Sequence, residues 1–347
     1  MRHHKPIVGI DLGGTNINVG IVDDALKVLP GSRVNKKTQA VQGVSVVLDR
    51  IASAVRESLD GAGLTPRGVS SIGIAAAGAV DSARGVVLKG GNLGFTNVPL
   101  AAQLRRRLGV RVIVENDVNA AVYGEWVHPR GAIRDVDHAL GVWIGTGVGG
   151  GLILSGRLYS GGFFTAGEIG HTPLVLGAPA GRRSVEQNCS RTAISDRLLA
   201  LVASGHESML RNLIDEEKKA LLDKARRDLK DKGKLTWQFE SNKILRSRAI
   251  SEAFGRGDPL TVNVVNEAAQ MLGIAIAGAV TLLSLPHVVL GGGFTEALGA
   301  PWVRAVRDAT RAHVFPPELR KVEVVGTRLR DQAGIIGAAL LARDATH

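Results

Sequence analysis

The stretch GEIGHTPLVLGAPAGRRSVEQNCS, residues 167–190, gathers side chains that can bind metals, transfer protons or hold polar ligands. Glu168 is followed three residues later by His171, and Glu186 stands shortly before Cys189, the only cysteine of the chain. Carboxylate, imidazole and thiolate groups are zinc ligands, and carboxylates and histidines also act as acids and bases. The same groups can hydrogen-bond a polar ligand. The stretch by itself leaves all three interpretations open.

Three glycine-rich turns have the composition of phosphate-binding loops. They are DLGGT at 11–15, GTGVGGG at 145–151 and GGG at 291–293. Glycines allow close backbone approach and positive φ, and successive backbone N–H groups form an anion-binding concavity. Asp11 could hold a metal ion on the phosphates, and Thr146 adds a hydroxyl. Each turn alone could be an ordinary hairpin, and none has the GK[ST] ending of a Walker loop or the GxGxxG context of a dinucleotide site.

The elements around these turns are predicted to be strands of an α/β fold. Residues 7–22 and 140–154 both read as strand, glycine turn, strand, which is a weak internal repeat and indicates two related lobes. GGG stands between a strand and a helix start, where a nucleotide can sit on the helix N-terminus. The strand VRVIVEND, 110–117, ends in polar groups, and ligands bind at that end of strands in open α/β sheets.

Apolar periodicity and helix signals complete the outline. Helices are predicted over about 44–61, 100–109 and 119–126, a long buried helix over 263–284, and a small-residue helix over 331–343 that can pack closely on a neighbour. Residues 205–257 differ from the rest, because six apolar residues among many charges share one helical face before a polar connector. Those residues are Leu210, Leu213, Ile214, Leu221, Leu222 and Leu229.

The bulk composition narrows the class of protein. A chain of 347 residues with 45% hydrophobic residues suits two lobes with a sizeable core. One cysteine fits a reducing cytosol and excludes a multi-cysteine zinc site. No signal peptide is recognisable, and no apolar run of about 18 residues is free of glycines and polar groups, so no membrane span is expected.

The net charge of +11 raises the question of a nucleic-acid partner. Aromatic residues are only 4% of the chain, and no helix-turn-helix or finger pattern precedes Gly9. We therefore interpret the basic residues as a solvated surface and expect no nucleic-acid partner. Such a surface would also attract anionic substrates such as nucleotides.

The motifs taken together identify a resemblance. In order they are DLGGTNINVG, GIAAAGAVD, NLGFTNVPL, ENDVNAAVYGE, IGTGVGGG, GEIGH, VLGGGF and AGIIGAALLA, and they span nearly the whole chain. The sequence resembles the ROK family of sugar kinases, within the actin-like ATPase superfamily. The resemblance implies a two-lobed actin-like ATPase fold, related to ribonuclease H, with nucleotide and sugar in the cleft between the lobes.

The implied domains are a small lobe and a large lobe. The small α/β lobe would comprise residues 1–119 and be completed by the C-terminal helix, about 331–347. The large α/β lobe would comprise residues 120–330, with a charged helical insertion at about 205–257.

The resemblance also implies roles for individual residues. Asp117 matches the catalytic base, which would accept the proton of the sugar hydroxyl, although an Asp at this place could also be a helix N-cap. Asn92 and Asn116 match sugar ligands, although Asn also favours turns. Glu168, His171 and Glu186 would bind sugar hydroxyls. The nucleotide side would comprise Asp11 with Mg²⁺, then Gly13, Gly14, Thr15, Gly145, Thr146, Gly147, Gly291 and Gly292.

Two departures from the family pattern stand out. Many members have Lys after DxGGT where this chain has Asn16, but GGTN also occurs in related hexokinases. Family members usually follow GEIGH with a CxCGxxGCxE run that holds a structural zinc with the histidine. Here the three cysteine positions are Gly177, Pro179 and Ser184, none of which can supply a thiolate.

The opening stretch is therefore predicted to have no structural zinc. Cys189 lies outside the zinc pattern and is interpreted as a buried small apolar residue. The loop between His171 and Glu186 would be held by its own packing and by Pro173 and Pro179. His171 would keep a role as a sugar ligand.

The sequence predicts an ATP-dependent sugar kinase that needs Mg²⁺, with glucose as the first choice of acceptor. Alternatives are a kinase for fructose, allose, N-acetylmannosamine or N-acetylglucosamine, and a non-catalytic ROK-type sugar sensor or transcriptional regulator. A regulator would carry a DNA-binding segment before the first lobe, whereas DLGGT begins at residue 11. An actin-like filament protein would need neither ENDVNA nor GEIGH. We expect a cytoplasmic homodimer whose small-molecule partners are a sugar and ATP.

Overall fold

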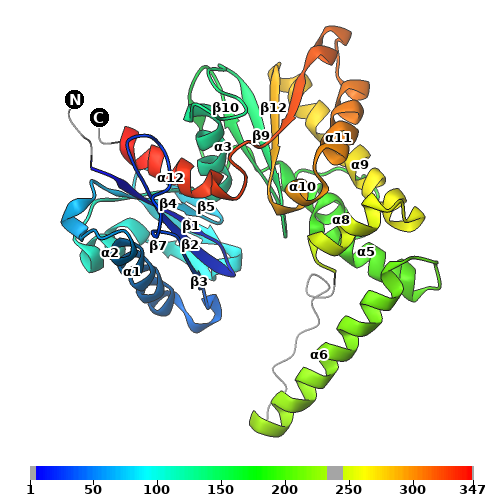
Figure 1. The fold of residues 1–347 in the computed structure, drawn as a ribbon. Helices are drawn as coiled ribbons and strands as arrows, with labels where there is room; N and C mark the ends of the chain where they lie inside the picture. The colour runs from blue at the N-terminus through cyan, green and yellow to red at the C-terminus, as the bar shows by residue number, and fades with distance from the viewer. Residues whose placement is uncertain (1–4, 233–244, 346–347) are drawn as a thin grey trace.

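The computed structural model describes residues 5–232 and 245–345 of the chain. Two five-stranded sheets form its two halves (Figure 1). A three-stranded sheet lies beside the first half, within its hydrophobic core. The strands are β1 (Ile7–Leu12), β2 (Asn16–Val22), β3 (Val34–Lys37), β4 (Ile72–Ala76), β5 (Ala79–Asp81), β6 (Val86–Gly90), β7 (Phe95–Val98), β8 (Val112–Asn116), β9 (Ala139–Ile144), β10 (Val148–Ile153), β11 (Leu158–Tyr159), β12 (His287–Gly291) and β13 (Glu323–Gly326).

The two five-stranded sheets share one topology. Their strand orders are β3-β2-β1-β4-β8 and β11-β10-β9-β12-β13. In each sheet a hairpin pairs antiparallel, β1 with β2 and β9 with β10. A third strand then pairs parallel with the first hairpin strand, β4 with β1 and β12 with β9, and a fourth strand, β8 or β13, pairs parallel with that third strand. Both hairpins turn at their glycine motif. The internal repeat predicted from the sequence is therefore confirmed as two sheets built on the same plan.

The helices follow the predicted order along the chain. Gly109 ends α2 in the left-handed conformation, with φ of 68°, as a glycine C-cap does. The helices are α1 (Val44–Gly61), α2 (Leu100–Leu108), α3 (Asp117–Val127), α4 (Glu186–Cys189), α5 (Arg191–Ala203), α6 (Leu210–Lys232), α8 (Ser247–Gly255), α9 (Pro259–Leu283), α10 (Gly293–Leu298), α11 (Ala300–His313) and α12 (Ala333–Asp344).

The C-terminal helix α12 packs against the first sheet and against α3 (Figure 1). Glycines make this contact close, because a Cβ on Gly9 of β1 or on Gly73 of β4 would lie about 2 Å from a carbonyl oxygen of α12. A Cβ on Gly337 of α12 would lie 1.7 Å from the carbonyl oxygen of Ala120 in α3. The predicted close packing of the small-residue helix is therefore confirmed.

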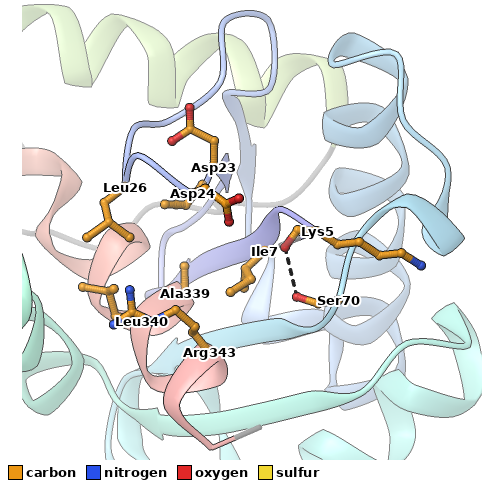
Figure 2. Close-up of a pocket in the computed structure, with 10 residues that line it drawn as sticks. Lys5, Ile7, Asp23, Asp24, Leu26, Ser70, Ala339, Leu340 and Arg343 are labelled. Carbon is orange, nitrogen blue, oxygen red and sulfur yellow. Dashed lines mark hydrogen bonds between the residues drawn. The ribbon is translucent and has the colours of Figure 1, made fainter. Parts of the chain in front are cut away.

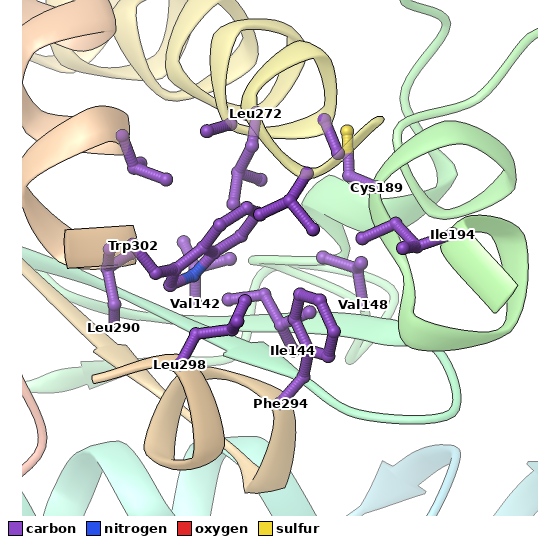
Figure 3. Packing of buried hydrophobic residues seen from close by; sticks show 14 of the residues in the cluster. Val142, Ile144, Val148, Cys189, Ile194, Leu272, Leu290, Phe294, Leu298 and Trp302 are labelled. Carbon is purple, nitrogen blue, oxygen red and sulfur yellow. The ribbon is translucent and has the colours of Figure 1, made fainter. Parts of the chain in front are cut away.

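The second half has its own hydrophobic core, which is mainly aliphatic and contains two aromatic side chains (Figure 3). Phe294 of α10 and Trp302 of α11 are fully buried and pack edge to face, with ring centroids 5.4 Å apart. Cys189 lies in the same core, and burial raises the pKa of its thiol to about 12. The interpretation of Cys189 as a buried apolar residue is confirmed.

Helix α9 is the most apolar long helix among the described residues. By length and composition alone it could cross a membrane, a property that buried core helices share. Half of the apolar window is buried inside the protein, and α9 packs against α11, α5 and α8. A helix in the core of a large lobe is apolar because much of its surface is buried against neighbouring helices. The glycines and alanines of α9 let those helices pack closely.

The charged insertion begins as predicted. Leu210 and Ile214 at the start of α6 join the core, whereas Leu222 is half exposed. The helix then projects from the second half (Figure 1). The predicted polar connector falls largely on residues 233–244, which lie outside the described residues.

The predicted domain boundary between residues 119 and 120 falls inside α3, which contacts both β4 and β10. We propose that α3 belongs to both lobes as the element that joins them. The division at these residues stays a prediction.

The close contact of α12 with α3 can be tested by Gly337→Ala. The added methyl group would collide with the Ala120 carbonyl, and we expect a loss of about 1–3 kcal/mol in the free energy of unfolding. Gly278→Ala in α9 is the matched control, because nothing lies within 4 Å of a Cβ there. That variant should be neutral or more stable by about 0.5–1 kcal/mol. Denaturant unfolding measures both variants, and equal stability would contradict the described packing.

Candidate active site

A cavity of about 610 Å³ lies where the two glycine hairpins, the end of β8 and the start of α12 meet. Of the residues predicted to act in the site, most line this cavity: Asp11, Gly13, Gly14, Asn92, Asn116, Asp117, Gly145, Thr146, Gly147, Glu168, His171, Glu186 and Gly292. The structure thus brings together groups that lie almost 300 residues apart in the sequence. Thr15 and Gly291 are not among the lining residues.

Asp117 is the first residue of α3, directly after β8. The helix is capped by Asn116, whose Oδ1 accepts hydrogen bonds from the backbone N–H of Val118 and Asn119, both at 2.9 Å. The alternative that Asp117 is the N-cap is therefore wrong. Asn116 also donates from Nδ2 to the Gly78 carbonyl, so its side chain fixes the strand end and the helix start together. Burial raises the pKa of Asp117, and the hydrogen bond from Val118 N–H opposes that rise.

Asp11 stands at the end of β1, on the same cavity. Burial and the nearby negative charge of Asp117 raise the pKa of Asp11 to about 6, although Asn18 donates a hydrogen bond to its carboxylate. Two carboxylates that disfavour each other's charge are typical of a site that takes up a cation or transfers a proton.

Of the two predicted reasons for glycine in the hairpin turns, positive φ does not apply. Gly13, Gly14, Gly145 and Gly147 do not have positive φ. Instead, a Cβ on Gly14 would lie 2.6 Å from the backbone oxygen of Asn92, and a Cβ on Gly147 would lie 2.2 Å from Oε2 of Glu186. Gly14 and Gly147 make room for the neighbouring site residues, so close approach decides the residue type at these two positions. Only the third turn has positive φ, of 87° at Gly292.

Glu168, His171 and Glu186 lie on the second half's side of the cavity. Burial raises the pKa of Glu168, while His171, with Nε2 4.0 Å from its carboxylate, lowers it. Glu186 accepts a hydrogen bond from the backbone N–H of Val148 at 2.9 Å. This bond places Glu186 between the second glycine turn and the other residues predicted to bind the sugar, Glu168 and His171.

The loop between His171 and Glu186 is closed by two amide side chains. Oε1 of Gln187 accepts from the backbone N–H of Arg183 and Ser184, at 2.9 and 3.1 Å. Nδ2 of Asn188 donates to the carbonyls of Arg182 and Ser184, at 2.9 and 2.8 Å. Pro173 and Ser184 also form an isolated β-bridge across the loop.

The residues at the family's zinc positions do not fit a zinc ion. Gly177, Pro179 and Ser184 supply no thiolate, and His171 is 69% exposed. Within residues 5–232 and 245–345, no group of three or more metal-binding side chains comes together. The loop is held by the side-chain hydrogen bonds of Gln187 and Asn188.

Several lining residues were missed by sequence reasoning. Gly293, Glu296, Arg330, Asp331 and Gly334 line the cavity near the third turn and the start of α12. Gly291 packs instead against the indole of Trp143. The family motif marked the glycines, but the contribution of 330–334 depends on how the C-terminal helix returns to the first sheet, which spacing does not reveal.

A second hollow lies at the edge of the first half, near the end of α12 (Figure 2). Its charged residues already have partners: Lys5 donates to the Arg67 carbonyl, Asp23 accepts from the Lys27 N–H, and Arg343 pairs with Asp344. Ser70 donates to the Lys5 carbonyl across its rim. The first cavity, with its facing carboxylates and glycine turns, is the candidate active site.

Comparison with known proteins decides the family. The family model described as "ROK family" matches residues 7–345. This chain belongs to the ROK family. It is 29% identical to the glucokinase of Thermotoga maritima over 97% of both chains. A crystal structure of a ROK family glucokinase from Streptomyces griseus, in complex with glucose and AMPPNP, superposes with a TM-score of 0.75 and 29% identity, covering 98% of this chain and 99% of that one.

The family also contains regulators. The xylose repressor of Caldicellulosiruptor bescii is 25% identical over 95% of this ROK chain and 76% of the repressor. The actin-like, two-lobed α/β fold predicted from the sequence is confirmed by the likeness to the ROK kinase structures. The relatives from Thermotoga maritima and Streptomyces griseus, by contrast, are named as glucokinases.

The site also bears on the metal that this ROK fold implies. Asp11 offers a carboxylate to the cavity, where burial and the negative charge of Asp117 raise its pKa. Mg²⁺ is usually bound by one or two carboxylates together with substrate phosphates. Asp11 therefore fits a magnesium ion that arrives with a nucleotide.

The raised pKa of Asp11 gives a pH-dependent stability. A carboxyl whose pKa is higher in the folded than in the unfolded protein stabilises the fold at a pH below its ordinary pKa. This contribution is lost as the pH rises through about 6, the pKa of Asp11 in the folded protein. The free energy of unfolding of Asp11→Asn should therefore exceed that of wild type at pH 8 by at most about 3 kcal/mol, and the difference should vanish near pH 4. The exposed Asp196→Asn is the control. A less stable Asp11→Asn protein at pH 8 would contradict the burial of this charge.

The hydrogen bonds of Gln187 and Asn188 predict how readily the loop between His171 and Glu186 opens to a protease. Asn188→Ala removes two hydrogen bonds to backbone carbonyls, so trypsin should cut after Arg182 or Arg183 about tenfold faster. EDTA should not change the cutting of wild type, because the loop needs no metal. The exposed Asn266→Ala on α9 is the matched control. Equal cutting of Asn188→Ala and wild type, or faster cutting of wild type in EDTA, would contradict this account.

Proposed function

We propose that the chain transfers the terminal phosphoryl group of ATP to a hydroxyl of a hexose, with glucose as the first acceptor to test. One observation carries the proposal: a half-buried carboxylate, Asp117, and the glycine turn at Thr146 line the same cavity from opposite halves of the protein. A base and a phosphate-binding turn facing one space are what in-line phosphoryl transfer needs.

In this proposal Asp117 is the base. Its carboxylate accepts the proton of the attacking hydroxyl while that oxygen bonds to phosphorus and ADP leaves. Burial favours this role, because it raises the pKa and so makes the carboxylate a stronger proton acceptor. Asn116 holds the strand end and the helix start, so the base has a fixed position.

The acceptor would lie against Glu168, His171, Glu186 and Asn92. Glu168 and Glu186 can each accept hydrogen bonds from sugar hydroxyls, and Asn116 keeps one amide proton for the same use. Because Glu186 also accepts from Val148 N–H, one of its oxygens is committed to the glycine turn. We propose that its other oxygen faces the sugar.

The donor would lie along the glycine turns. Backbone N–H groups at 13–15 and 145–147 would bind the phosphates, and Gly292 with Gly293 and Glu296 would border the nucleoside. Asp11 would hold Mg²⁺, which when bound neutralises charge on the phosphate oxygens. We propose a cytoplasmic homodimer as the working form.

A panel of sugars tests this function directly. In an ADP-release assay with Mg²⁺ and ATP, we expect turnover of glucose, with fructose, allose, N-acetylmannosamine and N-acetylglucosamine as the alternative acceptors. Asp117→Asn should lower kcat by about 10²–10⁴-fold and leave sugar binding within a few-fold of wild type, because a base acts in the chemical step. Asp196→Asn is the charge-matched control.

Two outcomes would overturn the proposal. Undiminished turnover by Asp117→Asn would remove the base from the mechanism. Binding of a sugar by wild type with no ADP release on any sugar would favour the sensor or regulator alternative, which the relationship to the xylose repressor also allows.

A further inference from the structure

The turn at Thr146 has little packing of its own. It connects β9 to β10 and carries one internal hydrogen bond, from Gly145 N–H to the Gly147 carbonyl at 2.9 Å. No atom lies within 4 Å of a Cβ placed on Gly145. Thr146 itself is exposed to the cavity. A glycine-flanked turn of this kind samples many conformations unless other elements hold it.

The first residues of α5 hold this turn by hydrogen bonds to the Gly145 carbonyl and to the hydroxyl and carbonyl of Thr146. Arg191 donates its backbone N–H to the Gly145 carbonyl at 3.0 Å and its Nη2 to Thr146 Oγ1 at 2.8 Å. Thr192 donates its hydroxyl to the Thr146 carbonyl at 2.8 Å. Ser190 fixes these residues in turn, because its side chain caps α5 by accepting from Ala193 N–H.

The direction of the Arg191 bond determines what Thr146 can do. A hydroxyl has one proton to donate, and the guanidinium occupies a lone pair of its oxygen. The proton of Thr146 is therefore left to point toward a different acceptor. A charged donor on the oxygen also polarises the hydroxyl and strengthens the hydrogen bond that the hydroxyl donates.

The charge of the cavity gives Arg191 a second effect. Six carboxylates line the cavity, and Arg330 is the arginine or lysine that lines it among the described residues. The negative charge of these carboxylates would repel the phosphates of a nucleotide bound in the cavity. Arg191 stands directly behind Thr146, is half-buried, and keeps its charge because arginine is not deprotonated in proteins.

We propose that Arg191 is a positioning residue for the phosphoryl donor: its guanidinium holds Thr146 so that the hydroxyl donates toward the donor's terminal phosphate. The inference rests on the proposed function, because it assigns the donor to the turn at 145–147. The same segment carries Glu186, which binds Val148 N–H on the other side of the turn. The segment 186–192 thus holds the donor turn and borders the acceptor site at once.

The experiment measures binding of AMPPNP with Mg²⁺ by calorimetry, so that it does not depend on turnover. Arg191→Met should weaken binding of this ATP analogue about tenfold, because a charge-assisted hydrogen bond and a positive charge are lost. Arg191→Lys should recover part of the loss, since it keeps the charge without the planar fork. Affinity for the sugar that wild type phosphorylates should stay within about twofold.

A double-mutant cycle separates positioning from general damage. If Arg191 acts through Thr146, Arg191→Met should weaken analogue binding less in the Thr146→Val background than in wild type, because only the effect of the lost charge remains there. Arg197→Met is the matched control, because this exposed arginine of the same helix pairs with Glu267, away from the turn. Melting temperatures identify any variant that fails to fold. If Arg191→Met fails to fold, the test uses Arg191→Lys in its place.

The outcomes distinguish this inference from the proposed function. Analogue binding by Arg191→Met at wild-type strength, or full additivity of the two substitutions, would overturn the role of Arg191. Equal weakening of sugar and analogue binding would also overturn it, because that is the result of a merely structural role. Analogue binding by a wild-type protein that phosphorylates no sugar would overturn the proposed function while leaving the Arg191 result valid.

Discussion

The close approach of α12 to the first sheet and to α3 is the constraint on which the site depends. Glycines at 9, 73 and 337 allow backbone to lie on backbone, where a single methyl group would collide with a carbonyl oxygen. This contact fixes α3, and so the position of Asp117 relative to Asp11 on β1. It also brings residues 330–334 to the cavity. Small residues far from the chemistry thus set the geometry of the two central carboxylates.

That geometry leaves the site with unbalanced negative charge. Asp11 and Asp117 are both held where their ionised forms are unfavourable, and Glu168 feels the charges of Asp117 and Glu186 as well. A cation that arrives with a nucleotide would relieve part of this repulsion. The energy that the fold loses at these carboxylates is typical of sites arranged for binding and catalysis.

Local signals in the sequence predicted much of the fold, and contacts between distant segments account for what it missed. Both hairpins and the C-cap at Gly109 follow from residues that are neighbours in the chain. Asn116, rather than Asp117, is the N-cap of α3 because its side chain, one residue earlier in the chain, reaches the free backbone N–H groups of both Val118 and Asn119. Gly147 is glycine because Glu186 approaches it, and Arg191 holds Thr146 across 45 residues. Neither contact could be predicted from spacing.

The most direct test of the account is a crystal structure of the protein with glucose and AMPPNP bound together. We predict a glucose hydroxyl within hydrogen-bonding distance of the Asp117 carboxylate, pointing toward the terminal phosphate. That phosphate should lie on the turn at 145–147. Glucose bound away from Asp117, or phosphates bound away from both glycine hairpins, would contradict the account.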